Sequence, residues 1–298
     1  MGKTASAFLA IVGRPNVGKS SLLNRFVGEK VAIVSPKPQT TRTRITGVLT
    51  QENTQFVFID TPGLHNPKTK LSEFMVKQIK DSVADVDAAV LVTEPLGKIH
   101  PTELELLQRF RDLRLPAILV INKIDTIPKK DMMMEKIAAF SELFPFEAVV
   151  PVSALNGDGL PQLLDELSHH AKEGPHYFPD DAMTDQPERV IIAEIIREKI
   201  LFRTEEEVPH SIAVVIENRE EDETQVFLQA MVIVERPSQK SILIGKQGSM
   251  IRSIRIAAQR ELRQMLGKRV ELELYVRVEE NWRNRESKLK QFGYNEHE

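Results

Sequence analysis

The amino-acid sequence predicts two domains, an α/β domain with a mostly parallel sheet and a smaller α+β domain after it. In the first half, short apolar runs rich in β-forming residues alternate with helical stretches, as in parallel sheets covered by helices. This alternation stops near residue 174. The chain of 298 residues is long enough for a second hydrophobic core beyond that point.

The strands of the first domain are expected at 7–12, 56–59, 88–92, 117–121 and 149–152. The segment 175–187 contains several prolines and acidic residues, and we interpret it as a linker between domains 1–174 and 188–298. The second domain is expected to form, in order, a helix (189–201), two strands (211–217 and 224–234), a turn with glycines, a helix (249–266) and a strand (269–278).

The composition restricts the chemistry that the chain can carry out. It contains no cysteine, which excludes disulfides, thiolate metal sites and a cysteine nucleophile. A metal ion must therefore be held by oxygen ligands and phosphate, and Mg²⁺ suits such ligands. No apolar run approaches the ~20 residues that span a bilayer, and the first residues do not resemble a signal peptide. We therefore expect a cytoplasmic protein.

The strongest motif is residues 13–20, Gly-Arg-Pro-Asn-Val-Gly-Lys-Ser, between an apolar strand and a helix. In a loop of this pattern, Gly13 and Gly18 let the backbone wrap a phosphate chain. Lys19 reaches the outer phosphates, and the Ser20 hydroxyl binds Mg²⁺. The candidate phosphate site comprises Gly13, Asn16, Val17, Gly18, Lys19, Ser20 and Ser21.

A second group of residues is expected to meet the metal ion and the γ-phosphate. The sequence Asp60-Thr61-Pro62-Gly63 follows an apolar strand, so that Asp60 can hold Mg²⁺ through water and the Gly63 N–H can reach the γ-phosphate. Thr41, in the polar segment Pro38-Gln39-Thr40-Thr41-Arg42, can also reach the metal ion and the γ-phosphate. The expected metal ligands are therefore Ser20, Thr41 and Asp60.

Two further strings are expected to bind a guanine base. In Asn122-Lys123-Ile124-Asp125, the Asp125 carboxylate can accept hydrogen bonds from guanine N1–H and N2–H₂, an edge that adenine does not offer. We expect this carboxylate to be buried, so that leaving it unpaired is costly and GTP is favoured over ATP. Ser153-Ala154-Leu155 can offer a backbone N–H to the guanine oxygen.

The second domain carries a nucleic-acid signature. Gly245-Lys246-Gln247-Gly248 lies between an expected apolar strand edge (242–244) and a helix, which resembles the KH domain, whose Gly-x-x-Gly turn clamps about four single-stranded nucleotides. Residues 236–269 hold nine basic residues and one acidic residue. On the following helix, Arg252 and Arg255 lie apart from the apolar stripe, and we expect them to contact RNA phosphates.

The ordered motifs resemble those of the Era family of bacterial GTPases, above all residues 13–20 and 38–42. A GTPase domain followed by a KH domain is the arrangement of that family, so the resemblance covers essentially the whole chain. It implies GTP hydrolysis, binding near the 3′ end of small-subunit ribosomal RNA during assembly of the small ribosomal subunit, and some contact with the cell membrane. We expect a monomer. One departure is Gln247, where the family commonly has glycine.

The resemblance also bears on catalysis. Leu64 stands where many GTPases have a glutamine that orients the attacking water. Several GTPases with an apolar residue there use a potassium ion held by the phosphate-loop asparagine, which corresponds to Asn16; a purely structural role for Asn16 remains open. The expected catalytic residues are Lys19, Asn16, Thr41 and Gly63.

A different class of function is also compatible with the sequence. The chain could be a nucleotide-regulated switch whose second domain grips a protein or an anionic membrane through its basic face. RNA and lipid both give salt-sensitive binding, so competition between single-stranded RNA and anionic vesicles is needed to separate them. A third possibility, enzymatic modification of RNA, is disfavoured because no nucleophile or metal-ligand cluster stands out.

Overall fold

The structure is a computed structural model that describes residues 3–63 and 69–294. It divides into two compact units. The first comprises Met1–Ala32, Thr41–Asn66 and Met75–Asp185, and the second comprises Ile33–Thr40, Pro67–Phe74 and Gln186–Glu298. Among the described residues, none of the helices combines the length and the apolar character that crossing a membrane requires.

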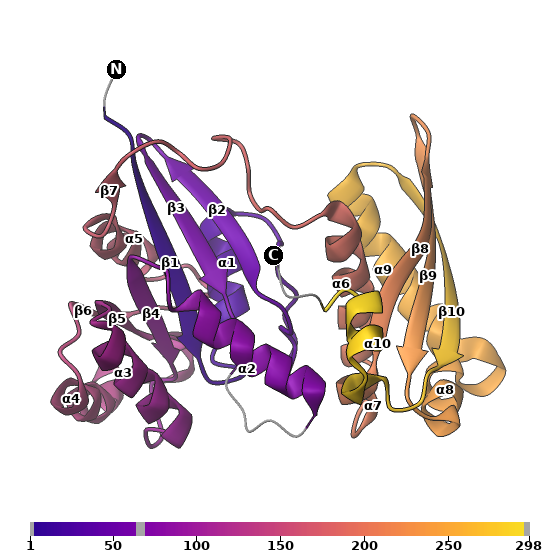
Figure 1. Ribbon diagram of the computed structural model, residues 1–298, viewed down its shortest axis with the longest axis horizontal. Coiled ribbons are helices and arrows are strands. Elements are labelled where there is room, and N and C mark those ends of the chain that lie inside the picture. Colours follow the sequence, from indigo (N-terminus) through magenta and orange to yellow (C-terminus); the bar gives the residue numbers. More distant parts are fainter. Residues whose placement is uncertain (1–2, 64–68, 295–298) are drawn as a thin grey trace. The chain divides into compact units, whose positions relative to one another are not determined.

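In the described part of the first unit, the strands form one sheet in the order β2-β3-β1-β4-β5-β6, with β7 paired to β1 (Figure 1). The strands are β1 (Ala5–Gly13), β2 (Ile45–Gln51), β3 (Thr54–Asp60), β4 (Ala88–Thr93), β5 (Ala117–Ile121), β6 (Ala148–Pro151) and β7 (Lys172–Glu173). Strand β2 runs antiparallel to β3, and β7 antiparallel to β1, while the other pairs are parallel. The predicted mostly parallel α/β sheet is therefore confirmed.

Helices cover both faces of this sheet. One core packs α1 (Lys19–Val27) and α5 (Leu160–Ser168) against the strands, and the other packs α2 (Lys70–Ser82), α3 (Pro101–Leu113) and α4 (Met134–Leu143). Strand β1 contributes alternate residues to the two cores, Leu9 and Ile11 to one and Ala10 and Val12 to the other. This burial on both faces explains why β1 reads as a continuous apolar run.

Strand β2 was not predicted. Its sequence, Ile-Thr-Gly-Val-Leu-Thr-Gln, lacks a continuous apolar run, and it lies at the antiparallel edge of the sheet. Gly47 there allows close packing, because a Cβ would meet the Leu23 side chain at 2.5 Å. The position is set by tertiary packing, which local sequence patterns do not report.

The segment for which the sequence predicts a linker runs along β2 and β3 as far as residue 185. The Gln55 side-chain oxygen accepts hydrogen bonds from the backbone N–H groups of Tyr177 (2.8 Å) and Phe178 (2.9 Å). The Val48 N–H donates to the Met183 carbonyl oxygen at 2.8 Å. Since an uncovered edge strand exposes unpaired backbone groups, this segment closes the edge of the sheet.

The second unit contains a three-stranded sheet in the order β10-β9-β8, with β9 and β10 parallel and β8 and β9 antiparallel. Its main elements are α6 (Glu188–Leu201), α7 (Val208–Ser211), β8 (Ala213–Glu221), β9 (Gln225–Val234), α8 (Pro237–Ile244), α9 (Ser249–Leu266) and β10 (Arg269–Val278). Helices α6 and α9 pack against each other and share a core with one face of the sheet. This is the predicted smaller α+β domain.

Two local predictions in this unit were wrong. Residues 242–244, expected as the edge of a strand, form the end of α8. Pro237 begins that helix, and the Gln239 side chain accepts hydrogen bonds from the backbone N–H groups of Glu235 and Arg236, so the capping at its start favours a helix. Ser211, expected in a strand, ends α7, where its hydroxyl donates to the Glu207 carbonyl oxygen.

Residues 282–294 pack around one tryptophan in this unit. Trp282, in the 3₁₀ helix η4 (Trp282–Asn284), is fully buried and donates from its ring nitrogen to the Ser211 carbonyl oxygen at 2.9 Å. Its ring stacks on Tyr294, which follows helix α10 (Glu286–Gln291). Tyr294 in turn meets the edge of Phe74 with ring centroids 6.3 Å apart.

The segment Ile33–Thr40 also belongs to this unit. Ile33 lies in its hydrophobic core, and the Glu198 carboxylate of α6 accepts a hydrogen bond from the Val34 N–H at 3.0 Å. Arg197, buried beside it, pairs with Glu194 and donates to the Thr40 carbonyl oxygen. Helix α6 thus holds both ends of a segment that the sequence assigns to the first domain.

Candidate nucleotide and RNA sites

The phosphate loop follows β1 and ends where α1 begins, as the motif requires. Gly13 has φ +147°, and a Cβ there would lie 2.3 Å from the Val92 carbonyl oxygen. Gly18 has φ +98°, and a Cβ there would lie 2.2 Å from the Asn122 side-chain nitrogen. Only glycine fits at either position, so the two glycines fix the path of the loop between β4 and Asn122.

Lys19 is buried at the base of this loop. Its ammonium donates to the carbonyl oxygens of Gly13 (3.2 Å) and Arg14 (2.9 Å). Burial lowers the pKa of Lys19 to about 8, while the negative charge of Asp60 acts in the opposite direction. A phosphate at the loop would supply the negative charge that this buried ammonium lacks.

Three predicted metal ligands meet beside Lys19. The Ser20 hydroxyl donates to Asp60 Oδ2 at 2.6 Å and lies 2.9 Å from the Thr41 hydroxyl, which is 3.4 Å from the same carboxylate oxygen. Burial raises the pKa of Asp60 to about 6, whereas the charge of Lys19 and hydrogen bonds from Ser20 and Thr41 lower it. The other oxygen, Asp60 Oδ1, is buried and has no hydrogen-bond partner among residues 3–63 and 69–294.

This donor set fits Mg²⁺, which prefers oxygen ligands and is commonly held by one carboxylate together with hydroxyls and substrate phosphates. Asp60 Oδ1 is a buried acceptor of the kind that a cation or its bound water satisfies. Ser20, Thr41 and Asp60 come from α1, the segment before β2, and the end of β3, so the fold brings together residues that are far apart in sequence.

The residues after Asp60 are also held against the phosphate loop. The Thr61 hydroxyl donates to the Ile11 carbonyl oxygen at 3.0 Å, and Pro62 is buried. A Cβ on Gly63 would lie 2.7 Å from the Pro15 backbone nitrogen. Only glycine allows this close approach, so the Gly63 backbone lies against the phosphate loop. Leu64, the expected substitute for a water-orienting glutamine, lies outside the described residues.

Asn122 joins the two halves of the nucleotide site. Its side-chain nitrogen donates to the Val17 carbonyl oxygen at 2.8 Å, and its oxygen accepts from the Ala154 N–H at 3.0 Å. Lys123 adopts a left-handed conformation and donates to the Asn16 carbonyl oxygen at 2.6 Å. The two expected base-binding strings are therefore positioned against the phosphate loop.

Asp125 lies at the open side of this arrangement and accepts a hydrogen bond from the Ser153 hydroxyl at 2.5 Å. The expectation that this carboxylate is buried was wrong, because Asp125 is exposed. The Asp125 carboxylate would lose its hydrating water only when a base covers it. Ala154 is buried, Leu155 is 77% exposed, and the Leu155 carbonyl oxygen accepts from Arg25 at 3.1 Å.

The structure adds residues that the sequence did not indicate. The buried Glu103 accepts from the Thr93 hydroxyl (2.7 Å) and from Arg14 of the phosphate loop (3.2 Å). Glu94 pairs with Lys123 at 2.6 Å and with Arg14 at 3.6 Å. Glu103 thus orients the phosphate loop through Arg14, and Glu94 orients both the phosphate loop and the loop that carries Lys123. The only sequence signal for Glu103 is its position three residues after His100, where it closes a capping box on α3.

In the second unit, Gly245 to Gly248 form a tight turn that includes the 3₁₀ helix η3 (Lys246–Gly248), and the Gly248 N–H donates to the Gly245 carbonyl oxygen. Lys246 and Gln247 are exposed at its tip. A Cβ on Gly245 would lie 2.7 Å from Met250 Cβ. Gln247 has φ +50°, a left-handed conformation that glycine adopts at lower cost, so a glutamine at this position strains the turn.

Beside this turn lies a hollow of about 400 Å³, which we call the KH groove, lined by Gly248, Ile251, Arg252, Arg255, Glu273, Leu274 and Tyr275. Arg252 and Arg255, for which the sequence predicts RNA contacts, both line this hollow. The β10 residues were missed. Tyr275 is 47% exposed and donates to Glu273 at 2.7 Å, which lowers the pKa of Glu273 and raises that of Tyr275.

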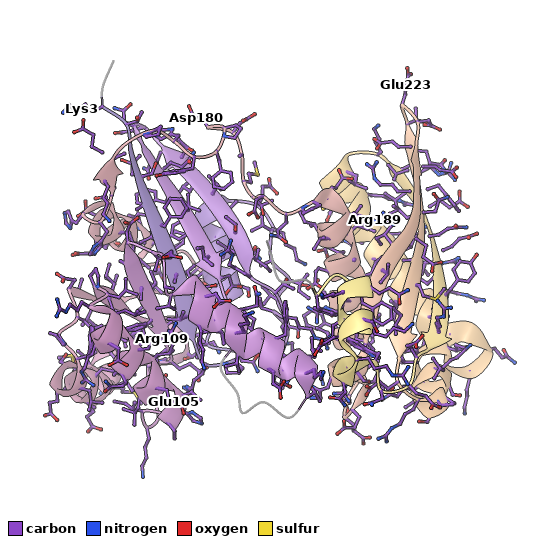
Figure 2. All side chains as sticks on the ribbon, in the orientation of Figure 1. Lys3, Glu105, Arg109, Asp180, Arg189 and Glu223 are labelled. Atoms are coloured by element: carbon purple, nitrogen blue, oxygen red, sulfur yellow. The ribbon has the colours of Figure 1, made fainter. Side chains whose placement is uncertain are left out.

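The acidic cluster 220–223 lies at the tip of the hairpin between β8 and β9, where Figure 2 labels Glu223. Glu221 pairs there with Lys268 at 2.5 Å and with Arg219 at 2.5 Å. Lys268, one of the nine basic residues counted in the sequence, therefore has an acidic partner. Arg252 and Arg255 form no ion pair within the described residues, so the positive charge is available at the KH groove.

Comparison with known proteins assigns each of the two units to a family. The family described as 50S ribosome-binding GTPase matches residues 8–123, and the KH domain family matches residues 207–283. The chain is similar to Era from Aquifex aeolicus, solved as a point variant bound to GDP·AlF4⁻, with 39% identity, a TM-score of 0.94, and coverage of 98% of this chain and 99% of that one.

The same identity, TM-score and coverage hold for a structure of Era in complex with MgGDPNP and nucleotides 1506–1542 of 16S ribosomal RNA. The likeness extends over nearly the full length of both chains. It therefore spans both units of this chain. The chain belongs to the Era family of GTPases.

Proposed function

We propose that this protein binds and hydrolyses GTP and uses its second unit to bind single-stranded RNA near the 3′ end of small-subunit ribosomal RNA, in assembly of the small ribosomal subunit. The observation that carries this proposal is the junction at Asn122, which ties the phosphate loop to the guanine strings in a chain that also has a KH groove. Era bound to MgGDPNP and 16S ribosomal RNA supports it.

Each residue around the phosphate loop has a role in this proposal. The backbone N–H groups of 13–21 bind the phosphates, and Lys19 neutralises their charge. Asp125 accepts the two N–H donors of guanine. The Ala154 N–H donates to the Asn122 side chain at 3.0 Å, which fixes the string that would meet the guanine oxygen. ATP cannot satisfy Asp125, so the site favours guanine nucleotides.

Ser20, Thr41 and Asp60 would hold Mg²⁺, which neutralises charge on the phosphate oxygens when bound. Gly63, closed against Pro15, would present its N–H to the γ-phosphate. Lys19 stabilises the charge that develops during transfer. We further propose that Asn16, exposed in the phosphate loop with φ +64°, helps to bind a potassium ion that takes the place of an arginine finger.

The nucleotide state is expected to reach the second unit through residues 33–41. Thr41 contacts Ser20 and Asp60 in the first unit, whereas the adjacent Thr40 is held by Arg197 in the second. A γ-phosphate and Mg²⁺ that order Thr41 would constrain the next residue along the chain. Hydrolysis would remove this constraint, as in other GTPase switches.

The test is to measure affinity for the 16S segment of nucleotides 1506–1542 with a non-hydrolysable GTP analogue and with GDP, and to follow GTP turnover. We expect turnover and a difference in RNA affinity between the two states. The rival function, a second unit that binds anionic membrane, predicts that anionic vesicles compete with RNA and bind more tightly. We place the protein in the cytoplasm, where both partners are accessible.

A further inference from the structure

Glu103 of α3 is a fully buried carboxylate that holds a residue of the phosphate loop. One of its oxygens, Oε1, accepts hydrogen bonds from the Thr93 hydroxyl at 2.7 Å and from Arg14 Nε at 3.2 Å. The other, Oε2, accepts from the His100 N–H at 2.7 Å. A carboxylate that is buried and engaged in this way does not itself contact a phosphate, so any effect on the nucleotide must pass through Arg14.

Two of these contacts fix Glu103 to rigid parts of the first unit. Thr93 ends β4 and is fully buried, and its carbonyl oxygen accepts from the Asn122 N–H at 2.8 Å. The contact with the His100 N–H belongs to the capping box at the start of α3. The carboxylate that meets Arg14 therefore has a set position, and hydrogen bonds between ionised groups are stronger than those between neutral groups.

Arg14 joins this anchor to Pro15. The Arg14 side chain is only 24% exposed, and its Nη2 lies 3.6 Å from Glu94 Oε2, so the guanidinium group is held by two carboxylates. Pro15 is the next residue along the chain. Because the proline ring fixes φ, the backbone at Pro15 has little freedom to absorb a shift of Arg14.

Gly63 rests on the backbone of Pro15. A Cβ on Gly63 would lie 2.7 Å from the Pro15 nitrogen and 2.8 Å from Pro15 Cα. The Gly63 N–H is the group expected to meet the γ-phosphate. A displacement of Pro15 would therefore move this N–H relative to the γ-phosphate. GDP has no γ-phosphate, so the same displacement would have little effect on GDP.

The part of the loop that follows Pro15 has anchors of its own. Lys123 donates to the Asn16 carbonyl oxygen at 2.6 Å, and the Asn122 side chain donates to the Val17 carbonyl oxygen at 2.8 Å. These contacts hold the backbone whose N–H groups bind the phosphates that GTP and GDP share. The contact between Glu103 and Arg14 thus bears on residues 14 and 15 rather than on the whole loop.

We infer that Glu103 is a positioning residue for the γ-phosphate, which acts through Arg14 and Pro15 on the Gly63 N–H. This inference rests on the proposed binding and hydrolysis of GTP. It adds a residue outside the nucleotide motifs that makes the site distinguish GTP from GDP and that supports hydrolysis without touching the nucleotide.

The substitution Glu103→Gln tests this role. The amide oxygen can still accept from the His100 N–H, and the amide nitrogen can still meet the Thr93 hydroxyl, but Arg14 Nε then faces a donor instead of an acceptor. Affinity for a non-hydrolysable GTP analogue and the rate of a single turnover of GTP should each fall by about tenfold. Affinity for GDP should be unchanged. The control is Glu105→Gln, at an exposed carboxylate of the same helix (Figure 2), which should change none of the three.

A second variant, Arg14→Ala, removes the other partner of the contact. It should show the same loss for the GTP analogue and for turnover, again with GDP affinity retained. Adding Glu103→Gln to Arg14→Ala should cause no further loss, because both substitutions break one contact. Circular dichroism establishes that each variant is folded. If Glu103→Gln does not fold, the comparison of GDP with the GTP analogue in Arg14→Ala decides the question.

Three results would overturn the positioning role. Equal losses of affinity for GDP and for the GTP analogue would mean that the contact holds the phosphate loop as a whole. Additive losses in the double variant would mean that Glu103 does not act through Arg14. Unchanged analogue affinity and turnover in both single variants would show that the contact has no effect on the γ-phosphate. If the unaltered protein bound neither nucleotide, the proposed function itself would fail.

Discussion

The Ser20 hydroxyl donates a 2.6 Å hydrogen bond to Asp60 Oδ2, while the buried Asp60 Oδ1 has no hydrogen-bond partner in the part of the chain that the structure describes. The carboxylate is thus oriented through one oxygen, and the other remains available. Since burial disfavours the charged form of Asp60 more than the charge of Lys19 favours it, this geometry is stabilised when a metal ion and phosphate are present. The pair therefore links the phosphate loop to the end of β3 through the metal site.

The first prediction concerns that pair. Ser20→Ala removes one metal ligand and the hydrogen bond that orients Asp60, and should lower Mg²⁺ affinity by about 10–100-fold. Nucleotide affinity measured with Mg²⁺ should then approach the value measured with a chelator. Ser141→Ala, at an exposed serine of α4, is the matched control, and its Mg²⁺ dependence should equal that of the unaltered protein. An undiminished effect of Mg²⁺ in Ser20→Ala would remove Ser20 from the metal site.

The second prediction concerns the base. Asp125→Asn replaces an acceptor with an amide that can donate to the carbonyl of xanthine, where guanine has an amino group. Affinity for GTP should fall by about 100-fold or more, and affinity for XTP should rise. Binding of fluorescent derivatives of both nucleotides measures this. Asp131→Asn, an exposed carboxylate in η2 (Lys130–Met133), should change neither affinity. Full GTP affinity in Asp125→Asn would show that Asp125 does not contact guanine.

The sequence predicted those parts of the molecule that depend on local chemistry. Strand β1 and the phosphate loop were recognisable because Gly13 and Gly18 are required by backbone geometry. Helix α9 and strand β10 were predicted with the bounds that the structure shows. In each case the residue pattern within one segment was sufficient.

The remaining features depend on contacts between distant segments. Glu103 orients Arg14, and Tyr275 lines the KH groove, but neither stands in a motif. The exposure of Asp125 could not be read from the sequence, because it depends on how the loops after β5 and β6 are arranged. Strand β2 was missed because its edge position is determined by the neighbouring strand.

The third prediction concerns potassium. If Asn16 helps to bind a monovalent cation, GTP turnover should be faster in K⁺ than in Na⁺ at matched ionic strength, and Asn16→Ala should abolish the difference. Nucleotide binding by Asn16→Ala, measured separately, should persist, since Lys19 and the loop backbone are retained. Equal turnover of the unaltered protein in both salts would leave Asn16 with a structural role only.

The fourth prediction concerns pH. His176 donates to Asp180 (2.7 Å) and to the Asn53 carbonyl oxygen (3.1 Å), and these bonds raise its pKa. Its stabilising contribution is therefore complete below the unfolded pKa, about 6.5, and is lost as pH rises through the higher folded pKa. Asp180→Asn should lower Tm by about 1–2 °C at acidic pH and have no effect at alkaline pH.

Thermal unfolding followed by circular dichroism at both pH values measures this difference. Asp181→Asn, the exposed neighbouring carboxylate, serves as control and should show no pH-dependent change in Tm. If the Tm of Asp180→Asn stays below that of the unaltered protein at a pH above the raised pKa of His176, Asp180 acts through something other than the charged histidine.

The last prediction concerns the clamp of the KH groove. Lys246→Asp combined with Gln247→Asp reverses charge at the tip of the turn while Gly245 and Gly248 keep its shape. Single-stranded RNA binding should fall sharply, because acidic groups would then face the phosphates. GTP binding should persist, since the nucleotide site has its own core.

Arg252→Ala and Arg255→Ala should instead weaken binding to RNA of every sequence. They should reduce the salt dependence of RNA binding by about one unit for each phosphate that the protein no longer neutralises.

A second Lys-Gln pair in the chain provides a matched control for the double substitution at Lys246 and Gln247. Lys290 and Gln291 are exposed in α10, and Lys290→Asp with Gln291→Asp changes the net charge by the same amount. RNA titrations at several salt concentrations should show a large loss for the first pair and little for the second. If the 246/247 variant bound RNA as well as the unaltered protein, the turn would not clamp RNA, and binding of the second unit to anionic vesicles would become the better account.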